Sequence, residues 1–157
     1  MTDHTTWLTQ EAYDRLKAEL DDRSGPQRAE IVKRIELARQ EGDLSENAGY
    51  HAARELQGLN EARIRQLTQL LEHVLVGSPE LAAGVVGYHK LVTVDFGGGD
   101  LETYFIGHVA EKEVTTHEVL TTQSHLGGAL MGKSVGDEVT YQLDNGRKVS
   151  VTVTDVQ

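Results

Sequence analysis

The chain has 157 residues, of which 38% are hydrophobic and 25% charged, a balance typical of a folded globular protein. It has no cysteine, which excludes disulfides and zinc fingers, and no stretch approaches the roughly 18 apolar residues that a membrane-spanning helix needs. Its formal net charge of -10 argues against a free-standing DNA- or RNA-binding protein, because such proteins neutralise phosphates with Lys and Arg. Since the first thirty residues also lack a signal-peptide pattern, we expect a cytoplasmic protein.

The first predicted element is an amphipathic helix that begins after Thr9, its N-cap, and ends near Gln40. Residues 24–26, Ser-Gly-Pro, interrupt the pattern. Leu20 and Ile31 are nevertheless eleven residues apart, about three helical turns, so both lie on the same face. We therefore predict a kink rather than the end of the helix.

A second helix is predicted after a short turn at residues 42–47, because Gly42 favours a helix stop and a new pattern starts at Tyr50. Apolar and polar residues then keep a heptad-like spacing as far as Val74. Two helices of roughly 30 residues joined by so short a turn must be antiparallel, and such a hairpin is about 45 Å long. Its seam is apolar near the base but polar toward the turn, at Gln57 and Asn60.

The second half of the chain has the pattern of strands, predicted at residues 91–96, 103–109, 119–122, 138–143 and 148–156. Hairpin turns are predicted at residues 97–100 and 144–146, and one short helix at residues 126–131. The sequence thus predicts an α+β protein. Its domains would be a helical hairpin at residues 1–76, a linker at 77–84 and a small β domain at 85–157.

Two acidic residues, Asp43 and Glu46, are predicted to lie at the end of the hairpin. One interpretation is a capping box, in which each carboxylate accepts a hydrogen bond from the start of the second helix. The other is a site for a partner, because exposed paired carboxylates bind hard cations such as magnesium. The spacing alone leaves both open.

Basic residues gather on the first helix between residues 23 and 39, against the overall charge of the chain. Most of them are expected to form solvated pairs four residues apart, such as Glu30 with Arg34. Arg39 and Arg54 lie nearest to the turn and are the candidates for RNA contact. His51 has no second metal-ligating residue at a suitable spacing and is interpreted as a surface histidine.

Residues 41–55 resemble the signature of the Gre-factor family, a G-D-L-x-E-N-x-x-Y-H-A-A run that joins the two helices of a hairpin. Residues 7–20 resemble the opening helix of the family, and residues 124–132 resemble its C-terminal S-P-L-G-x-A-L-x-G element. The resemblance covers nearly the whole chain and is closest to the A-type factors.

This resemblance implies a transcription elongation factor with a coiled-coil hairpin and an FKBP-like C-terminal domain. The factor would bind bacterial RNA polymerase at its secondary channel, reach the nascent RNA 3′ end of a backtracked complex and stimulate cleavage of the transcript by the polymerase. Asp43 and Glu46 would share a Mg²⁺ ion with the polymerase, so the chain would be neither an enzyme itself nor a stable holder of a cofactor. We expect a monomer. The polymerase-docking candidates are Ser124, His125, Leu126 and Gly127.

Two departures from the family pattern are Gly49, where many members have an acid, and His125, where proline is usual. The histidine adds a group that titrates near neutrality to the docking element. An alternative function is a Gre-like regulator that occupies the channel and inhibits polymerase without stimulating cleavage. A prolyl isomerase is suggested by fold analogy alone, which is weak evidence of activity.

Overall fold

The computed structural model describes residues 5–43 and 46–157. The chain divides into two compact units, one at Tyr13–His73 and the other joining the N-terminal residues up to Ala12 with Val74–Gln157. Within the described residues, no helix has the length and apolar character needed to cross a membrane. The predicted α+β fold is confirmed.

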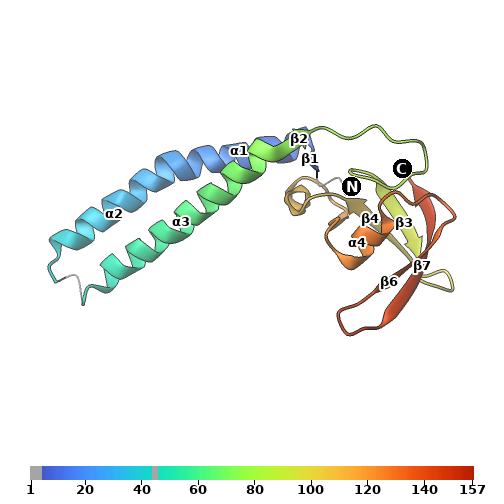
Figure 1. The fold of residues 1–157 in the computed structure, drawn as a ribbon. Helices are drawn as coiled ribbons and strands as arrows, with labels where there is room; N and C mark the ends of the chain where they lie inside the picture. The colour runs from blue at the N-terminus through green and yellow to red at the C-terminus, as the bar shows by residue number, and fades with distance from the viewer. Residues whose placement is uncertain (1–4, 44–45) are drawn as a thin grey trace. The chain divides into compact units, whose positions relative to one another are not determined.

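The first arm of the hairpin consists of α1 (Gln10–Asp22), η1 (Arg23–Gln27) and α2 (Arg28–Gln40), which follow one another without a break (Figure 1). Thr9 caps α1 as predicted, because its Oγ1 accepts a hydrogen bond from the backbone N–H of Ala12 at 3.2 Å. The predicted kink takes the form of η1, a π-helical turn that contains Pro26. Proline has no N–H to donate, so a regular α-helix cannot continue through it unchanged.

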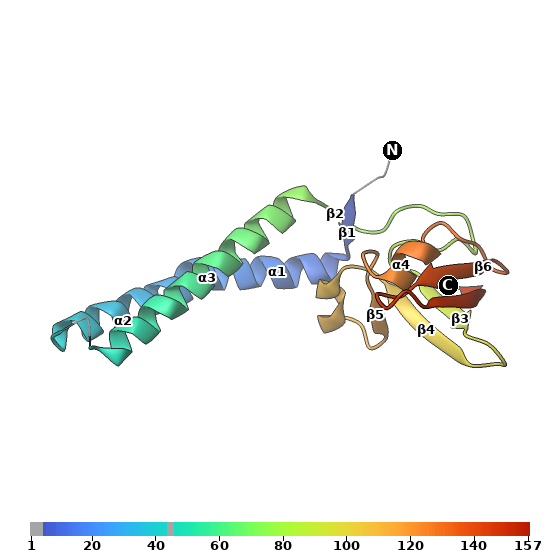
Figure 2. The ribbon, with the colours of Figure 1, turned by 60° about the horizontal axis from the view of Figure 1, so that its bottom comes forward.

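The second arm is α3 (Ala48–His73), which lies antiparallel to α2 (Figures 1 and 2). Its buried residues recur at the predicted heptad spacing and are Ala53, Asn60, Ile64 and Leu67. The facing side of α2 buries Ile31, Ile35 and Ala38. Between them, Ile31, Ile35 and Ala53 form an apolar cluster on which Tyr50 packs. The hairpin therefore has a narrow seam rather than an enclosed core.

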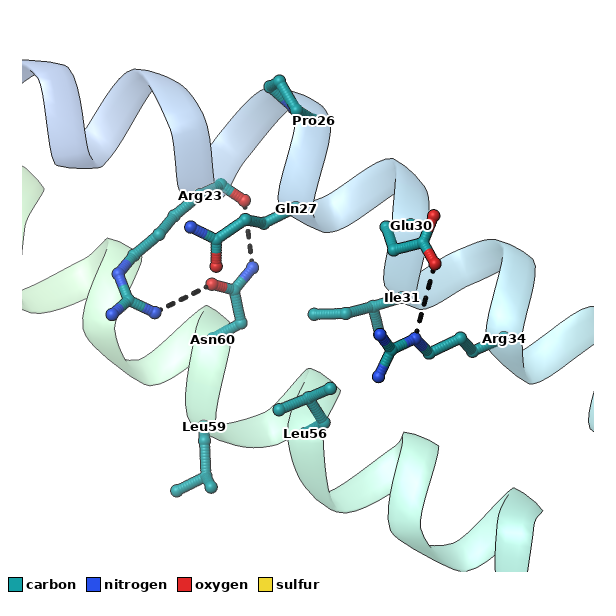
Figure 3. A pocket seen from close by; sticks show the side chains of 9 residues that line it. All are labelled: Arg23, Pro26, Gln27, Glu30, Ile31, Arg34, Leu56, Leu59 and Asn60. Carbon is teal, nitrogen blue, oxygen red and sulfur yellow. Dashed lines mark hydrogen bonds and ion pairs between the residues drawn. The ribbon is translucent and has the colours of Figure 1, made fainter.

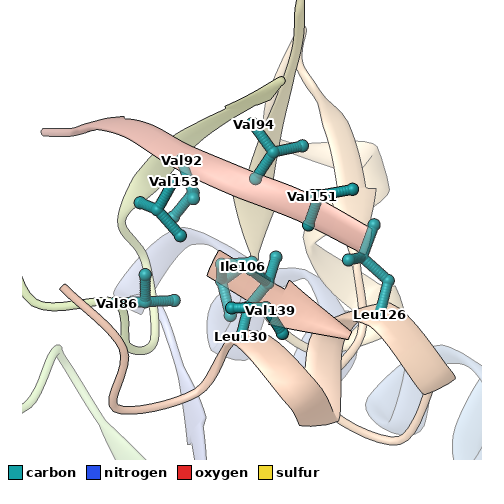
Figure 4. Packing of buried hydrophobic residues seen from close by; sticks show 9 residues of the cluster. All are labelled: Val86, Val92, Val94, Ile106, Leu126, Leu130, Val139, Val151 and Val153. Atoms are coloured by element: carbon teal, nitrogen blue, oxygen red, sulfur yellow. The ribbon is translucent and has the colours of Figure 1, made fainter. Parts of the chain in front are cut away.

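The second unit contains a five-stranded sheet in the order β5-β4-β3-β7-β6. The bounds of its strands are β3 (Leu91–Asp95), β4 (Leu101–Ile106), β5 (Glu118–Leu120), β6 (Glu138–Gln142) and β7 (Lys148–Val156). Neighbouring strands are antiparallel except β4 and β5, which are parallel. The helix α4 (His125–Leu130) contributes Leu126 and Leu130 to the valine-rich core on one side of this sheet (Figure 4).

The sequence did not predict the parallel pair β1 (Thr6–Leu8) and β2 (Val74–Val76). Strands of three residues are too short to show a period. It also extended one strand to residue 109, whereas β4 ends at Ile106. Shortly after β4 the chain forms η2 (Val109–Glu113), a 3-10 helix. His108 caps its first turn, because its Nδ1 accepts a hydrogen bond from the N–H of Ala110 at 3.1 Å.

Candidate functional site in the acidic turn of the hairpin

The turn of the hairpin begins just after α2, where the backbone reaches a left-handed conformation at Gly42. The N–H of Glu41 donates to the carbonyl of Ala38 at 3.1 Å, and the N–H of Gly42 donates to that of Arg39 at 3.4 Å. Gly42 has a φ of 118°, a conformation that residues with a Cβ rarely adopt. The predicted role of Gly42 as a helix stop is confirmed.

The helix α3 is capped by Asn47. Its Oδ1 accepts a hydrogen bond from the N–H of Tyr50 at 3.0 Å, the usual geometry of an N-cap. Its Nδ2 donates to the carbonyl of Ala38 at 2.6 Å, at the end of the other arm. One side chain thus satisfies backbone groups of both helices. Asn47 was not predicted as a cap, although an Asn directly before a helical pattern is a recognised start signal.

This cap bears on the two interpretations of the acidic pair. Since α3 begins at Ala48 and is capped by Asn47, Glu46 precedes the cap and does not occupy the third helical position that a capping box requires. Asp43 and Glu46 are both exposed. The predicted tip, residues 42–47, includes residues 44 and 45, which lie outside the described residues. The two carboxylates therefore present oxygen atoms to solvent at the end of the hairpin.

The candidate RNA-contact residues are exposed on either side of this turn. Arg39 lies 3.8 Å from Glu36 in a solvated pair, and the Nη1 of Arg54 donates to the Oε1 of Gln57 at 2.7 Å. Neither contact buries the guanidinium group. Both arginines could exchange these contacts for a phosphate, because an exposed ion pair contributes little free energy and the contact of Arg54 is to a neutral amide.

Farther from the turn, the basic residues of the first arm are used within the hairpin. Glu19 accepts from Arg23 of the same arm and from Arg63 of α3, and their guanidinium groups bring its pKa down to about 2 although burial raises it. Arg28 makes two hydrogen bonds to Glu61 of α3, at 2.8 and 2.9 Å. The expected pair of Glu30 with Arg34 is also present, at 3.4 Å. Of these pairs, Arg28 with Glu61 and Arg63 with Glu19 join the two arms, whereas Glu30 and Arg34 both belong to α2.

The docking candidates in the second unit divide into buried and exposed residues. Ser124 is the N-cap of α4, accepting from the N–H of Gly127 at 3.0 Å and donating to the carbonyl of Thr121 at 2.7 Å. Leu126 and Gly127 are buried. Only His125 among the four candidates has an exposed side chain, and its Nε2 lies 2.7 Å from the Oδ1 of Asp144. Any direct docking contact through side chains of this element would centre on His125.

A buried carboxylate in the same unit was not foreseen from the sequence. Glu111 is fully buried, and Thr9 donates to it from both its N–H, at 2.9 Å, and its Oγ1, at 2.6 Å. The Nε2 of His89 lies 3.5 Å from Glu111, while its Nδ1 lies 2.7 Å from the hydroxyl of Ser78. Glu111 lies 102 residues from Thr9 along the chain, so no local pattern could reveal the contact.

The described residues contain no group of three or more His, Cys, Asp or Glu side chains that could hold a metal ion. The acidic turn supplies carboxylate oxygens, which are the ligands that magnesium prefers. Magnesium is commonly held by one or two protein carboxylates while waters and phosphates complete its shell. Asp43 and Glu46 therefore fit a shared magnesium site better than a complete one.

Comparison with known proteins gives the same family over both halves of the chain. The family described as "Transcription elongation factor, N-terminal" matches residues 6–76, and "Transcription elongation factor, GreA/GreB, C-term" matches residues 81–157. The chain is 48% identical over 153 residues to the transcription elongation factor GreA of Streptomyces avermitilis, covering 97% of this chain and 93% of that one. It is 46% identical over 161 residues to GreA of Mycobacterium tuberculosis, covering 100% and 98%.

Among solved structures, the chain is similar to GreA factor homolog 1 of Thermus thermophilus, with 24% identity and a TM-score of 0.45. The match covers 98% of this chain and 99% of the other.

Proposed function

The chain belongs to the GreA/GreB family of transcription elongation factors, which confirms the function predicted from the sequence, and we propose that Asp43 and Glu46 perform it. In this proposal the hairpin enters the secondary channel of RNA polymerase when the enzyme has backtracked. The two carboxylates then take part in holding a magnesium ion at the polymerase active site, and the polymerase cleaves its own transcript. The observation that supports this role is the exposure of both acids at the end of a hairpin whose cap is a separate residue, Asn47.

The carboxylates act by adding negative oxygen ligands where the polymerase alone provides too few. When bound, the shared magnesium would supply Lewis acidity and orient the attacking water. Asp43 and Glu46 raise the occupancy of that site, and one of their oxygens can accept a hydrogen bond from the water. The short turn between α2 and α3 keeps both carboxylates at the same end of the hairpin.

The two exposed arginines beside the turn would hold the extruded RNA. Arg39 lies in α2 and Arg54 lies in α3, so each arm carries a cation close to the acidic turn. A guanidinium group binds phosphate oxygens with two parallel hydrogen bonds. In this arrangement the arginines position the RNA 3′ end, and the acids remain available to the metal.

Docking would depend on the second unit, with His125 as the exposed residue of the docking element. A monomer suffices, because the acids, the arginines and this element all belong to one chain. In this proposal the exposed His125–Asp144 pair is the part of the element that contacts the polymerase.

The test uses purified RNA polymerase complexes stalled in a backtracked position. We expect the parent protein to shorten the RNA from its 3′ end, and Asp43→Asn or Glu46→Gln to reduce the rate by about 100-fold or more while binding is unchanged. Glu41→Gln is the matched control, because Glu41 is an exposed acid on the α2 side of the same turn. Higher magnesium concentrations should partly restore the two variants, since they lose metal ligands.

The same assay separates the alternative function. A protein that binds the complex and slows nucleotide addition, yet leaves the RNA uncut at every magnesium concentration, would be a channel-occupying inhibitor. In that case the assignment of Asp43 and Glu46 to cleavage would be wrong.

A further inference from the structure

We propose that Asn60 is a positioning residue for the acidic turn, because it fixes the register between the two arms of the hairpin. The residue lies in α3, well away from the turn, and is a polar residue that is buried in the hairpin. Its importance for cleavage rests on the proposed function of Asp43 and Glu46. Its effect on register does not, and can be measured on the protein alone.

Both ends of the Asn60 side chain bond to one residue of the opposite arm (Figure 3). The Nδ2 donates to the backbone carbonyl of Arg23 at 2.9 Å, and the Oδ1 accepts from the Nη1 of the same residue at 3.1 Å. The side chain is only 3% exposed. An unpaired amide at this depth would be costly, so the contact favours the single alignment that satisfies both groups.

The partner of Asn60 is a distinctive point on the first arm. Arg23 is the first residue of η1, the π-helical turn that contains Pro26. Two backbone carbonyls near Arg23 also accept hydrogen bonds from side chains. The Oγ of Ser24 donates to the carbonyl of Leu20 at 2.7 Å, and the Nη1 of Arg28 donates to the carbonyl of Ser24 at 3.4 Å. A shift of one helical turn would take Asn60 away from both the carbonyl and the guanidinium group of Arg23. The paired contact with Arg23 therefore marks one register.

Apolar packing does not select the register at this level of the hairpin. Beside Asn60 an open groove of about 450 Å³ runs between the arms, with Ile31 on one side and Leu56 and Leu59 on the other (Figure 3). Leu59 is 64% exposed and Leu56 39%, so neither is locked into a core. Residues spaced alternately by three and four present a similar seam after a shift of one turn. A buried polar residue is the usual means by which such a seam specifies its alignment.

The flanking ion pairs are weaker constraints. Arg28 with Glu61, and Arg63 with Glu19, also join the two arms, but the side chains are 29% to 43% exposed. Long, partly solvated side chains can follow a shift of the helices, so these pairs stabilise the hairpin without fixing one alignment. Asn60 is short and buried, and its amide reaches only the residue directly opposite.

Register matters because the metal tolerates little displacement. One helical turn is about 5.4 Å, whereas magnesium–oxygen bonds are about 2.1 Å long with strict geometry. If one arm shifted, the turn would have to rebuild, and Asp43 and Glu46 would be carried to new positions. A misplacement of about 1 Å can already cost about 100-fold in rate.

The test compares Asn60→Leu with Gln57→Leu in the full chain. Gln57 is the other polar residue of the seam, but its hydrogen bond is to Arg54 within the same helix. The chain has no cysteine, so Lys33→Cys and Glu55→Cys allow spin labels to be attached to exposed positions on the two arms. Electron–electron distance measurements then report the register directly. Transcript cleavage is followed over a range of factor concentrations.

We expect Asn60→Leu to replace one narrow distance distribution by a broad or double one, while the unfolding midpoint stays equal or rises because an apolar residue enters the seam. The maximal cleavage rate should fall about tenfold, with the half-saturating concentration unchanged. Gln57→Leu should keep the parent distance and rate. A single parent-like distance in Asn60→Leu would overturn the inference, whatever the stability or rate.

If Asn60→Leu loses its helical signal, Asn60→Ala takes its place in the distance measurement under the same criterion. If the parent protein itself leaves the RNA uncut, the proposed function fails. The distance distributions still decide whether Asn60 fixes the register.

Discussion

The side-chain amide of Asn47 donates a hydrogen bond to the backbone carbonyl of Ala38 at 2.6 Å and so joins the start of α3 to the end of α2. The amide adds a second hydrogen bond to a carbonyl that already accepts from the N–H of Glu41, and this second bond joins the two arms at the turn. Because the same side chain accepts from the N–H of Tyr50, both helix ends depend on it. The position of the acidic turn is therefore linked to Asn47.

Replacing Asn47 with Ala should lower the free energy of unfolding of the hairpin by about 1 to 2 kcal/mol, since a helix cap and one further hydrogen bond are lost. Urea unfolding followed by the helical circular dichroism signal measures this change. Gln40→Ala, an exposed position at the end of α2, is the control. Equal stability of the two variants would show that Asn47 does not cap α3 in solution.

The hairpin should lose stability in acid through Glu19. Its pKa is about 2 in the folded protein and about 4.5 in the unfolded chain, with Arg63 as the largest cause. A lowered folded-state pKa means that the stabilisation is fully present above pH 4.5 and is lost as the pH falls toward 2. After allowance for solvent screening, we expect a loss on the order of 1 to 2 kcal/mol.

The measurement is urea unfolding of the parent and of Glu19→Gln across that pH range. The variant should be less stable than the parent near neutrality and should show a flatter dependence on pH. If both proteins gave parallel curves, the interaction of Glu19 with Arg63 and Arg23 would contribute nothing to stability.

Burial raises the pKa of Glu111, but the neighbouring imidazole of His89 and the hydrogen bonds from Thr9 outweigh it and leave the pKa below its ordinary value. The carboxylate is thus charged and paired at neutral pH. Glu111→Ala should lower the free energy of unfolding of the second unit by about 3 kcal/mol or more, because it leaves the donors of Thr9 without their acceptor. Glu138→Ala removes an exposed acid of the same unit and should change stability little. A small effect of Glu111→Ala, similar to that of Glu138→Ala, would contradict this assignment.

The periodic parts of the fold could be predicted from sequence, and the contacts between distant segments could not. Helical spacing located both arms of the hairpin, and Gly42 located its turn, because each signal is local. In the sequence, Asn60 stood out only as part of the polar end of the seam, together with Gln57. Its partner, the carbonyl of Arg23, becomes visible once the π turn and the alignment of the arms are known. The same holds for Glu111 with Thr9.

At the candidate site, the sequence located the exposed acids but left open whether they cap a helix. The ambiguity arose because a one-residue difference in where α3 begins decides which side chain occupies the cap, and helix ends are the least predictable part of an element. The docking element shows the opposite limitation. Leu126 and Gly127 belong to the motif of the family, yet they are buried, since a sequence motif does not distinguish residues that shape an element from residues that contact a partner.

Two glycines give opposite predictions for the same substitution. At Gly127 an added Cβ would lie 1.9 Å from the carbonyl oxygen of Thr121, so Gly127→Ala should destabilise the second unit by about 1 to 3 kcal/mol.

At Gly58, on the exposed surface of α3, an added Cβ meets nothing within 4 Å. Gly58→Ala should therefore stabilise the hairpin by about 0.5 to 1 kcal/mol, because alanine loses less backbone entropy in a helix than glycine. Thermal unfolding of the two variants, with the helical and the near-ultraviolet signals followed separately, tests both. Stabilisation by Gly127→Ala would mean that the turn from Thr121 into α4 is looser than described.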